Sequence, residues 1–311
     1  MVIEVLLACY NGEKYLPVQL ASLAGQTDVD FRVLMQDDGS TDGTRALLEK
    51  QTADARFRLV NDTSPVRLHG AVGNFWSLLG QATEDYTALC DQDDCWFPNR
   101  LRDGMAAMQA AELRWGKHTP LLIHSDAQVV DAAGQVLQPS FFRHQGWNPQ
   151  AVQLSRLLVQ NNVTGCTVLM NRPLRELALA HGSPADMYMH DWFLALTAAA
   201  FGHVVCVPHP LVQYRQHGDN EMGASGANLA VRGAKALSTR EKGKKRMELT
   251  FRHTASFAEA YDGVLPQEAA QVVRRYLALE KKPKLLRMWG MERGNYRMQS
   301  FITRAGQLIF C

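Results

Sequence analysis

The chain has 311 residues, of which 46% are hydrophobic and 21% charged, and its formal net charge is +2. This length and hydrophobic content exclude a chain without a folded core and predict one large core or two small domains. No apolar run reaches the roughly 18 residues of a membrane span. The longest candidate, residues 193–207, is interrupted by Gly202 and His203. The N-terminus lacks the basic segment of a signal peptide, so we expect a soluble protein that is not exported.

Cysteine usage agrees with that expectation. No CxxC pair and no zinc-like spacing occurs among the six cysteines, which are Cys9, Cys90, Cys95, Cys166, Cys206 and Cys311. Most lie inside apolar runs, so they are expected to be buried free thiols in a reducing compartment. The predicted localisation is therefore the cytoplasm.

The net charge of +2 conceals a split along the chain. Residues 1–224 carry 16 Lys and Arg against 24 Asp and Glu, a balance of −8. Residues 225–311 carry 17 against 7, a balance of +10. A basic region beside an acidic body is typical of contact with an anionic partner, such as a membrane surface or nucleic acid. A solvated helical face explains the same pattern equally well.

In chain order, the first half alternates predicted strands with predicted helices. The strands are expected over residues 2–8, 31–35, 57–60 and 86–90, and the helices over residues 13–23, 41–51 and 74–81. Ser40 or Thr41 is the expected N-cap of the second helix. Alternation at this spacing predicts an α/β domain with a mainly parallel sheet.

The second half is more mixed. Neighbouring strands are expected over residues 121–124 and 128–131, further strands over 165–170, 204–207 and 211–214, and helices over 172–180 and 191–200. Residues 141–147 form a predicted aromatic and basic loop, and residues 218–226, rich in small and polar side chains, a predicted boundary. Beyond that boundary we expect basic helices.

The segment Asp91-Gln92-Asp93-Asp94 ends the apolar run over residues 86–90. Three carboxylates within four residues repel one another unless a cation lies between them. Side chains at positions i and i+2 of an extended segment point the same way, so Asp91 and Asp93 are expected to face one ligand. Such hard oxygen ligands suit Mg2+ or Mn2+ carrying substrate phosphates. The alternative is an acidic turn that opens the next helix.

Polar clusters follow three of the predicted strands, at residues 8–12, 36–40 and 91–94. Ligands of open α/β sheets bind outside the carboxyl ends of the strands. The three clusters are therefore expected to line one crevice, which favours an enzyme.

Residues 6–16, 36–44 and 91–96 together resemble the family 2 glycosyltransferases of the GT-A fold, in order and spacing over about residues 1–220. The resemblance implies a single Rossmann-like, mainly parallel sheet flanked by helices, with a C-terminal helical extension. It implies a GT-A domain over residues 1–224, with a nucleotide-binding half (1–100) and an acceptor half (101–224). Residues 225–311 would form the basic helical region.

The resemblance also implies a nucleotide site, made by Ala8, Tyr10, Asn11, Glu13, Asp38, Asn74, Asp91 and Gln92. Asp93 is the favoured direct metal ligand, with Asp94 as the competing position. His217 resembles the histidine that completes the metal site in many GT-A enzymes, although a lone histidine is more often structural. The implied cofactor is Mn2+ or Mg2+, which would neutralise the pyrophosphate of a nucleotide sugar.

Asp191 resembles the general base of the family, and the alternative is that it only caps the following helix. His190 occupies a place where the family commonly carries an acidic residue, and Trp192 follows the predicted base. Arg215 is a candidate contact for the diphosphate. Asp126 is a candidate contact for sugar hydroxyls, or equally a turn aspartate.

The same segments resemble bacterial rhamnosyltransferases of surface polysaccharide assembly. This implies inverting transfer of L-rhamnose from dTDP-L-rhamnose to a hydroxyl of a lipid-linked saccharide, in O-antigen or capsule synthesis. The basic C-terminal region would hold the enzyme at the inner face of the cell membrane, without nucleic-acid binding and with oligomerisation left open. One alternative is the same fold with a UDP-hexose donor. The other is a different class of enzyme, a Mg-dependent phosphatase of the haloacid dehalogenase type. A carbohydrate- or nucleic-acid-binding protein would leave the carboxylates Asp91, Asp93, Asp94 and Asp191 unexplained.

Overall fold

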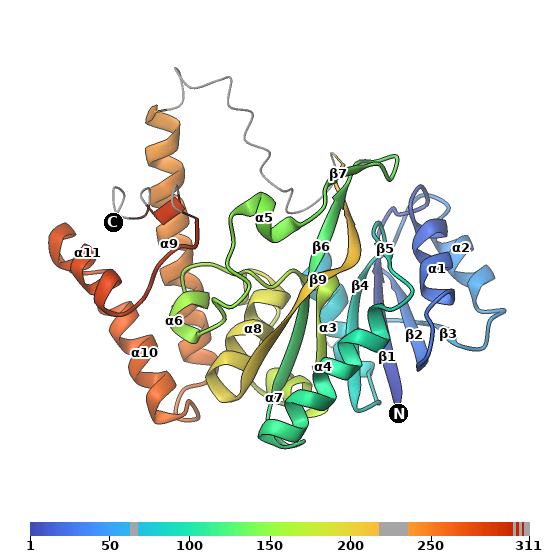
Figure 1. Cartoon of the computed structure of the whole chain (residues 1–311), viewed down its shortest axis with the longest axis horizontal. Helices are drawn as coiled ribbons and strands as arrows, with labels where there is room; N and C mark the ends of the chain where they lie inside the picture. The colour runs from blue at the N-terminus through green and yellow to red at the C-terminus, as the bar shows by residue number, and fades with distance from the viewer. Residues whose placement is uncertain (63–67, 218–235, 301–302, 305–306, 308–311) are drawn as a thin grey trace.

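A nine-stranded sheet runs through the described part of the chain, which in this computed structural model comprises residues 1–62, 68–217, 236–300, 303–304 and 307 (Figure 1). The strands are β1 (Val2–Cys9), β2 (Asp30–Asp37), β3 (Phe57–Val60), β4 (Tyr86–Asp91), β5 (Cys95–Trp96), β6 (Leu121–Val130), β7 (Val136–Gln138), β8 (Leu169–Asn171) and β9 (His203–Arg215). The order across the sheet is β3-β2-β1-β4-β8-β6-β9-β5, with β7 paired to β6.

Helices connect these strands and continue beyond the last one. They are α1 (Leu16–Ala24), α2 (Thr44–Gln51), α3 (Ala71–Gln81), α4 (Arg100–Trp115), α5 (Phe141–Gln145), α6 (Leu154–Leu157), the 3-10 turn η1 (Gly165–Thr167), α7 (Arg172–His181), α8 (His190–Phe201), α9 (Ala236–Ala260), α10 (Gln267–Leu277) and α11 (Lys284–Arg293).

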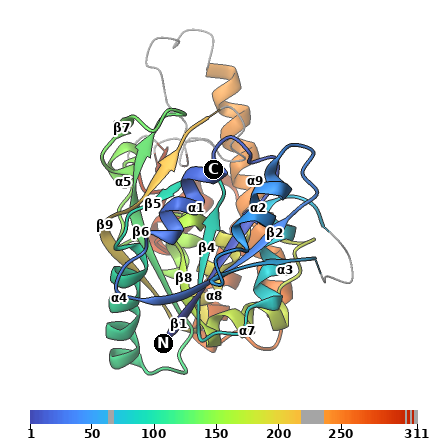
Figure 2. The same cartoon turned by 90° about the vertical axis from the view of Figure 1, so that its right-hand side faces the viewer.

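Strands β3, β2, β1 and β4 pair in parallel, as expected from the alternating pattern. β6 and β9 are also parallel, whereas β8 runs antiparallel to both β4 and β6, so the complete sheet is mixed. β1 begins beside the N-terminus at the bottom of Figures 1 and 2. The carboxyl ends of β1, β2 and β4 therefore face the upper side in both views.

Several local predictions differ from the structure. The two strands expected over residues 121–131 are one continuous strand, β6, and those over 204–214 are one strand, β9. Register shifts between β6 and β9 near Ser125 and Asp126 explain the break in the apolar pattern. The aromatic loop contains the short helix α5. The expected strand over residues 165–170 starts as the turn η1 before β8.

The start of α2 also differs from the prediction. The N-cap is Gly43 rather than Ser40 or Thr41, and no side chain makes the capping hydrogen bond. Instead the Asp42 carboxylate accepts hydrogen bonds from the backbone N–H and the hydroxyl of Thr44. The turn before the helix is therefore longer than the sequence pattern indicated.

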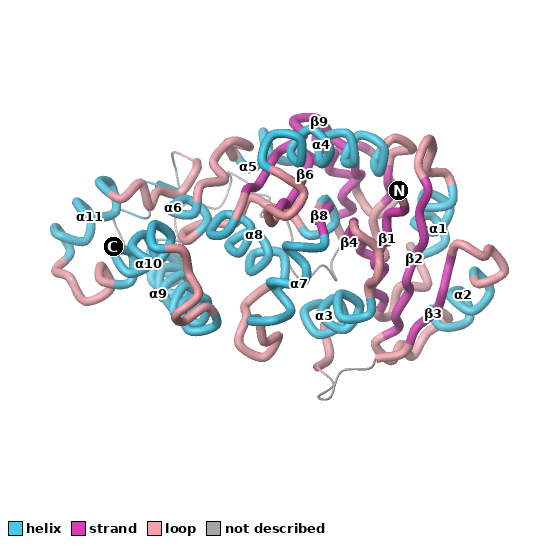
Figure 3. Tube along the Cα trace, turned by 90° about the horizontal axis from the view of Figure 1, so that it is seen from below, coloured by secondary structure: helices cyan, strands magenta, loops and turns pink. Residues whose placement is uncertain are grey.

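The hydrophobic core has two parts, one on each face of the sheet. Along β1, Leu6 belongs to the part covered by α3, α7 and α8, while Val5 and Leu7 belong to the part covered by α1, α2 and α4. Figure 3, seen from below, shows α4 on one side of the strands and α3 and α7 on the other. Side chains of a strand alternate between faces, so a strand with apolar residues throughout is buried on both.

The C-terminal helices pack into the same core. Phe251, Phe257, Tyr261 and Tyr276 are buried in the cluster that α8 and α3 also enter. The expected helical character of this region is confirmed for α9, α10 and α11. The proposed boundary at residues 224–225 lies outside the described residues and stays a prediction. None of the described helices is both long enough and apolar enough to cross a membrane.

Candidate active site

A cavity of about 610 Å³ opens at the carboxyl ends of β1, β2 and β4. The three polar clusters meet there as predicted, with Tyr10, Asp38 and Asp91 contributed by three different strand ends. The predicted site residues that line it are Ala8, Tyr10, Asp38, Asn74, Asp91, Gln92, Asp93, His190, Asp191 and Trp192. Parallel pairing of β1 with β2 and β4 brings the strand ends together, and the start of α8 adds His190, Asp191 and Trp192, up to 184 positions after Ala8.

Short polar contacts hold the strand ends in place. The Gln92 side chain accepts a hydrogen bond from the Tyr10 N–H at 2.8 Å and donates one to the Tyr10 carbonyl at 2.7 Å. The Asn74 amide donates to the Cys9 carbonyl at 3.2 Å. The Asp38 carboxylate accepts from the Gly70 N–H at 2.7 Å. These contacts fix the rim of the cavity at the strand ends.

Gly73 lies in the first turn of α3, beside Asn74. A Cβ atom on Gly73 would overlap the carbonyl of Leu68. The glycine therefore permits the close approach of the preceding loop, and this positions Asn74 and Asp38 at the cavity.

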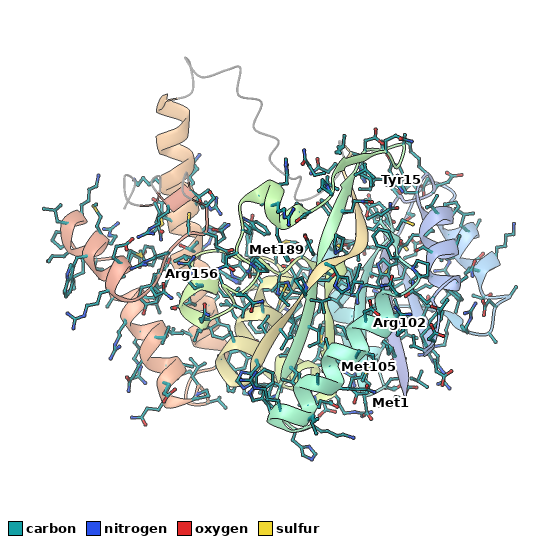
Figure 4. All side chains as sticks on the ribbon, viewed as in Figure 1. Met1, Tyr15, Arg102, Met105, Arg156 and Met189 are labelled. Atoms are coloured by element: carbon teal, nitrogen blue, oxygen red, sulfur yellow. The ribbon has the colours of Figure 1, made fainter. Side chains whose placement is uncertain are left out.

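The acidic segment divides into residues that face the cavity and one that does not. Asp91 and Asp93 line the cavity. The Asp93 carboxylate lies 2.8 Å from Nε2 of His217, whose ring stacks on Tyr15, labelled in Figure 4, with ring centroids 4.7 Å apart. The structure thus brings together the two residues predicted as metal ligands, which are 124 positions apart.

Asp94 points into the protein and is buried. Its Oδ1 accepts a hydrogen bond from the Arg215 N–H at 3.0 Å, while Oδ2 has no hydrogen-bond partner among the described residues. Burial, followed by the charge of Asp93, raises the pKa of the Asp94 carboxyl above its usual range. Asp93 is therefore the better placed of the two for a cation in the cavity.

Ligand atoms of Asp91, Asp94 and Cys166 also lie within 4.8 Å of one another. Burial raises the pKa of the Cys166 thiol well above its ordinary value, so the sulfur stays protonated. A protonated soft thiol is a poor partner for Mg2+ or Mn2+. The carboxylates of Asp91 and Asp93 with the imidazole of His217 fit these cations better.

Asp191 lies in the first turn of α8, directly after His190 and two positions after Met189 (labelled in Figure 4). Its Oδ2 accepts a hydrogen bond from the Gly165 N–H at 3.1 Å, and Oδ1 is buried with no partner among the described residues. The N-cap of α8 is Met189, so the alternative of Asp191 as the cap is wrong. Desolvation raises the pKa of the Asp191 carboxyl to about 7.

His190 packs its ring against Phe75, with ring centroids 4.4 Å apart, and burial lowers its pKa to about 3. A neutral imidazole therefore stands beside Asp191 in place of a second carboxylate. Trp192 donates its indole N–H to the Leu157 carbonyl at 2.7 Å, which anchors the start of α8.

Besides Asp94, the predicted site residues that do not line the cavity are His217, which contacts Asp93, and Asn11, Glu13, Asp126 and Arg215. Asn11, which has a positive φ of 48°, accepts from the Thr41 N–H, and Glu13 accepts from the Gly43 N–H, so both hold the loop before α2. Asp126 lies within β6, so the turn alternative is wrong; its buried carboxylate accepts hydrogen bonds from the Ser140 hydroxyl and the Phe142 N–H at the start of α5. Arg215 donates to the carbonyls of Asp93, Asp131 and Ala132, so its guanidinium holds backbone rather than facing the cavity.

Other lining residues were not anticipated from the sequence. Gly165 comes from the turn η1 and Thr164 directly precedes it, Tyr188 comes from the segment before α8, and Arg246 comes from α9. None of them carries a local pattern that indicates a site. Arg246 stands within a basic run that by itself indicates only a charged surface.

The geometry defines a cavity with carboxylates for a cation at the strand ends and a separate buried carboxylate on α8. Residues 4–114 match the family described as Glycosyl transferase family 2. The chain therefore carries a family 2 glycosyl transferase domain and is a glycosyltransferase of the GT-A fold.

Among curated proteins, the chain is similar to dTDP-rhamnosyl transferase RfbG of Shigella flexneri. The two are 25% identical over 229 residues, which cover 70% of this chain and 74% of RfbG.

Two solved structures share the fold. TarS residues 1–349 from S. aureus, in complex with UDP-GlcNAc, has a TM-score of 0.59 and 15% identity, covering 100% of this chain and 89% of that chain. The mannosyltransferase PcManGT from Pyrobaculum calidifontis, in complex with GDP-Man and Mn2+, has a TM-score of 0.53 and 17% identity, covering 94% and 72%.

Proposed function

We propose that the protein is an inverting, metal-dependent glycosyltransferase in which Asp191 is the general base. The observation that carries this proposal is a partly unpaired carboxylate, with a pKa of about 7, in the same cavity as Asp91 and Asp93. A base with a pKa near neutrality both exists as the carboxylate and accepts a proton effectively. Asp191 would take the proton of the acceptor hydroxyl while that oxygen attacks the anomeric carbon. The nucleoside diphosphate would leave from the opposite face, so a single displacement inverts the configuration.

Asp93 and His217 are proposed to hold Mn2+ or Mg2+, with Asp91 near the ribose or a metal-bound water. A bound divalent ion would neutralise the charge that develops on the departing diphosphate. The neighbouring fold of PcManGT contains Mn2+ with GDP-Man. A thermal-shift titration tests this part: dTDP or UDP should stabilise the protein only when Mn2+ or Mg2+ is present.

The proposed nucleotide site comprises Ala8, Tyr10, Asp38, Asn74, Asp91 and Gln92, which line the cavity at the strand ends. Asn11 and Glu13 would act through the loop that they hold. Arg215 would position Asp93 and Asp94 rather than contact the diphosphate directly.

The proposed donor is dTDP-L-rhamnose, on the strength of the similarity to RfbG. Inversion of its β-linkage would form an α-rhamnoside. A UDP-hexose is the second candidate, because TarS residues 1–349, which share the fold, were solved with UDP-GlcNAc. A competition assay with dTDP-L-rhamnose, UDP-glucose and UDP-N-acetylglucosamine distinguishes the two. Transfer from a UDP-hexose with none from dTDP-L-rhamnose would exclude the rhamnose donor.

The phosphatase alternative gains no support. In such enzymes the nucleophilic aspartate normally ends the first strand of the fold, whereas Asp91 ends β4. The family match over residues 4–114 also points to glycosyl transfer.

The proposed acceptor is a saccharide carried by a lipid, in bacterial O-antigen or capsule synthesis. The supporting feature is α11, on which Leu285, Leu286 and Trp289 are 78%, 56% and 60% exposed. Lys281 and Arg287 lie in the same segment, and this mixture of apolar and basic side chains is typical of an interfacial helix. We therefore propose that α11 contacts the anionic inner face of the cell membrane.

The C-terminal apolar residues Phe301, Ile302, Leu308, Ile309 and Phe310 are expected either to extend that contact or to pack back on the body. They lie outside the described residues, as do Cys311 and the segment 218–235.

A further inference from the structure

Arg246 is the one Lys or Arg side chain among the described residues that line the catalytic cavity. The acidic groups of the lining are Asp38, Asp91, Asp93 and Asp191. Three of these four come from the strand ends, where the nucleotide and its metal are proposed to bind. The arginine comes from α9, beyond the sheet.

The position of Arg246 separates it from the nucleotide end. α8, which carries Asp191 in its first turn, lies between α9 and β4 in both Figure 1 and Figure 3. Leu249 and Thr250, on the same helix as Arg246, also line the cavity, and so does Tyr188, which interacts electrostatically with the arginine. The proposed base therefore stands between the strand ends and this wall, which is the acceptor side of the reaction.

The guanidinium of Arg246 is not used by the fold. It makes no hydrogen bond or ion pair with any residue in the described ranges, and it is exposed to solvent through the cavity. Enough protein surrounds it that desolvation lowers its pKa, with Tyr188 acting in the opposite direction. An arginine that lines a cavity and has no carboxylate partner among the described residues gains most from an anionic ligand.

Its neighbours in the sequence behave differently. Lys244 is exposed and lies 3.8 Å from Glu248, one turn along the same helix, in an ordinary surface pair. The basic run over residues 244–246 is thus split between a solvated face and the cavity, and only the cavity position needs a further explanation.

We propose that Arg246 forms an anion subsite for the acceptor, which takes a phosphate or carboxylate group carried near the reacting hydroxyl. This inference rests on the proposed function, because it uses Asp191 to define the acceptor side. The two chemical sources are a lipid phosphate and an acidic sugar. A planar guanidinium binds either oxyanion through two parallel hydrogen bonds.

The test is a calorimetric titration of the full chain, with the nucleotide end first saturated by dTDP and Mn2+. The probes are octyl phosphate, methyl glucuronide and the neutral octyl glucoside. Arg246→Gln should weaken binding of the favoured anion by about tenfold or more, the usual scale for a charge-assisted hydrogen bond. Arg246→Lys should restore part of it. Lys244→Gln is the matched control and should bind within about twofold of the parent.

The outcomes separate the sources. Arg246-dependent binding of octyl phosphate indicates a lipid-phosphate acceptor, and Arg246-dependent binding of methyl glucuronide indicates an acidic sugar. The proposal is overturned if the parent binds neither anion, or if Arg246→Gln and Lys244→Gln change affinity equally. Thermal unfolding of each variant, with its dTDP affinity measured alongside, shows whether a loss is specific to the anion. The titration measures binding and not sugar transfer. The role of Arg246 can therefore still be judged if Asp191 turns out not to be the general base.

Discussion

The Oδ2 atom of Asp191 accepts a hydrogen bond of 3.1 Å from the backbone N–H of Gly165, across 26 positions of sequence. This contact ties the turn η1 to the first turn of α8, while the buried Oδ1 has no hydrogen-bond partner among the described residues. A Cβ at position 165 would stand 3.2 Å from Nε2 of His190 and 3.7 Å from Asp191. A side chain at position 165 would therefore crowd the His190 ring, whereas its distance from Asp191 is that of an ordinary van der Waals contact.

Asp191→Asn is expected to slow sugar transfer at least ~100-fold while leaving dTDP affinity nearly unchanged. The asparagine oxygen can still accept the Gly165 N–H, so the local structure is retained while the basicity is lost. Steady-state transfer and nucleotide titration on the same preparation check this. Normal turnover by Asp191→Asn would mean that another group is the base.

The pH dependence follows from the same residue. Because the pKa of Asp191 is raised to about 7, the base is protonated at pH 6 and ionised at pH 8. The transfer rate at saturating substrate should rise with pH through about 7 and then level. A rate that is already constant from pH 5 upward would contradict this assignment.

The raised pKa also predicts a stability change. A carboxyl that binds its proton more tightly in the folded state stabilises the fold below the unfolded pKa, and this contribution is lost as pH rises through about 7. The asparagine of Asp191→Asn does not ionise, so the variant does not lose this contribution to folding stability as the pH rises. Urea unfolding should show the variant gaining stability relative to the parent between pH 4 and pH 8, by about 4 kcal/mol, because each pKa unit corresponds to about 1.4 kcal/mol. A difference that is independent of pH would argue against the raised pKa.

Asp93→Ala is expected to abolish transfer and metal-dependent nucleotide binding together. Its carboxylate lines the cavity and lies 2.8 Å from Nε2 of His217, so the ion would lose one proposed ligand and the contact that holds the second. His217→Ala should weaken Mn2+ binding by about ten- to a hundredfold. Asp28→Ala, on a side chain that is 67% exposed, serves as the control. Retained turnover by Asp93→Ala would remove the metal role from this position.

Membrane contact through α11 is tested by point variants, because truncation would remove Phe251, Phe257 and Tyr261 from the shared core. Replacing Leu285, Leu286 and Trp289 together by Gln should reduce flotation with anionic vesicles at low salt. Leu113→Gln is the matched control, since that leucine is 91% exposed on α4.

Salt should weaken the binding as well, because each basic residue near an anionic surface contributes about 1 kcal/mol and is screened by salt. The membrane proposal fails if the parent protein does not float with the vesicles, or if the triple variant floats equally well.

Local patterning determined much of the first half of this protein. β3 has the bounds that its apolar run predicts, and β1, β2 and β4 lie where expected. Once those strands are parallel, their carboxyl ends must meet, and so the cavity-lining positions of Tyr10, Asp38, Asp91 and Asp93 followed from sequence alone. The motifs that carry the family resemblance also lie at the ends of β1, β2 and β4, so the resemblance and the strand pattern predict the same site.

Other features depended on contacts between distant parts of the chain. Arg215 has the chemistry of a diphosphate ligand, but its position at the end of β9 turns it toward backbone carbonyls. The pKa of Asp191 depends on burial, and burial depends on how α8 packs against its neighbours. Arg246 enters the cavity only because α9 folds back onto the shared core. Desolvation and long-range packing are properties of the folded chain, so only the tertiary structure decided them.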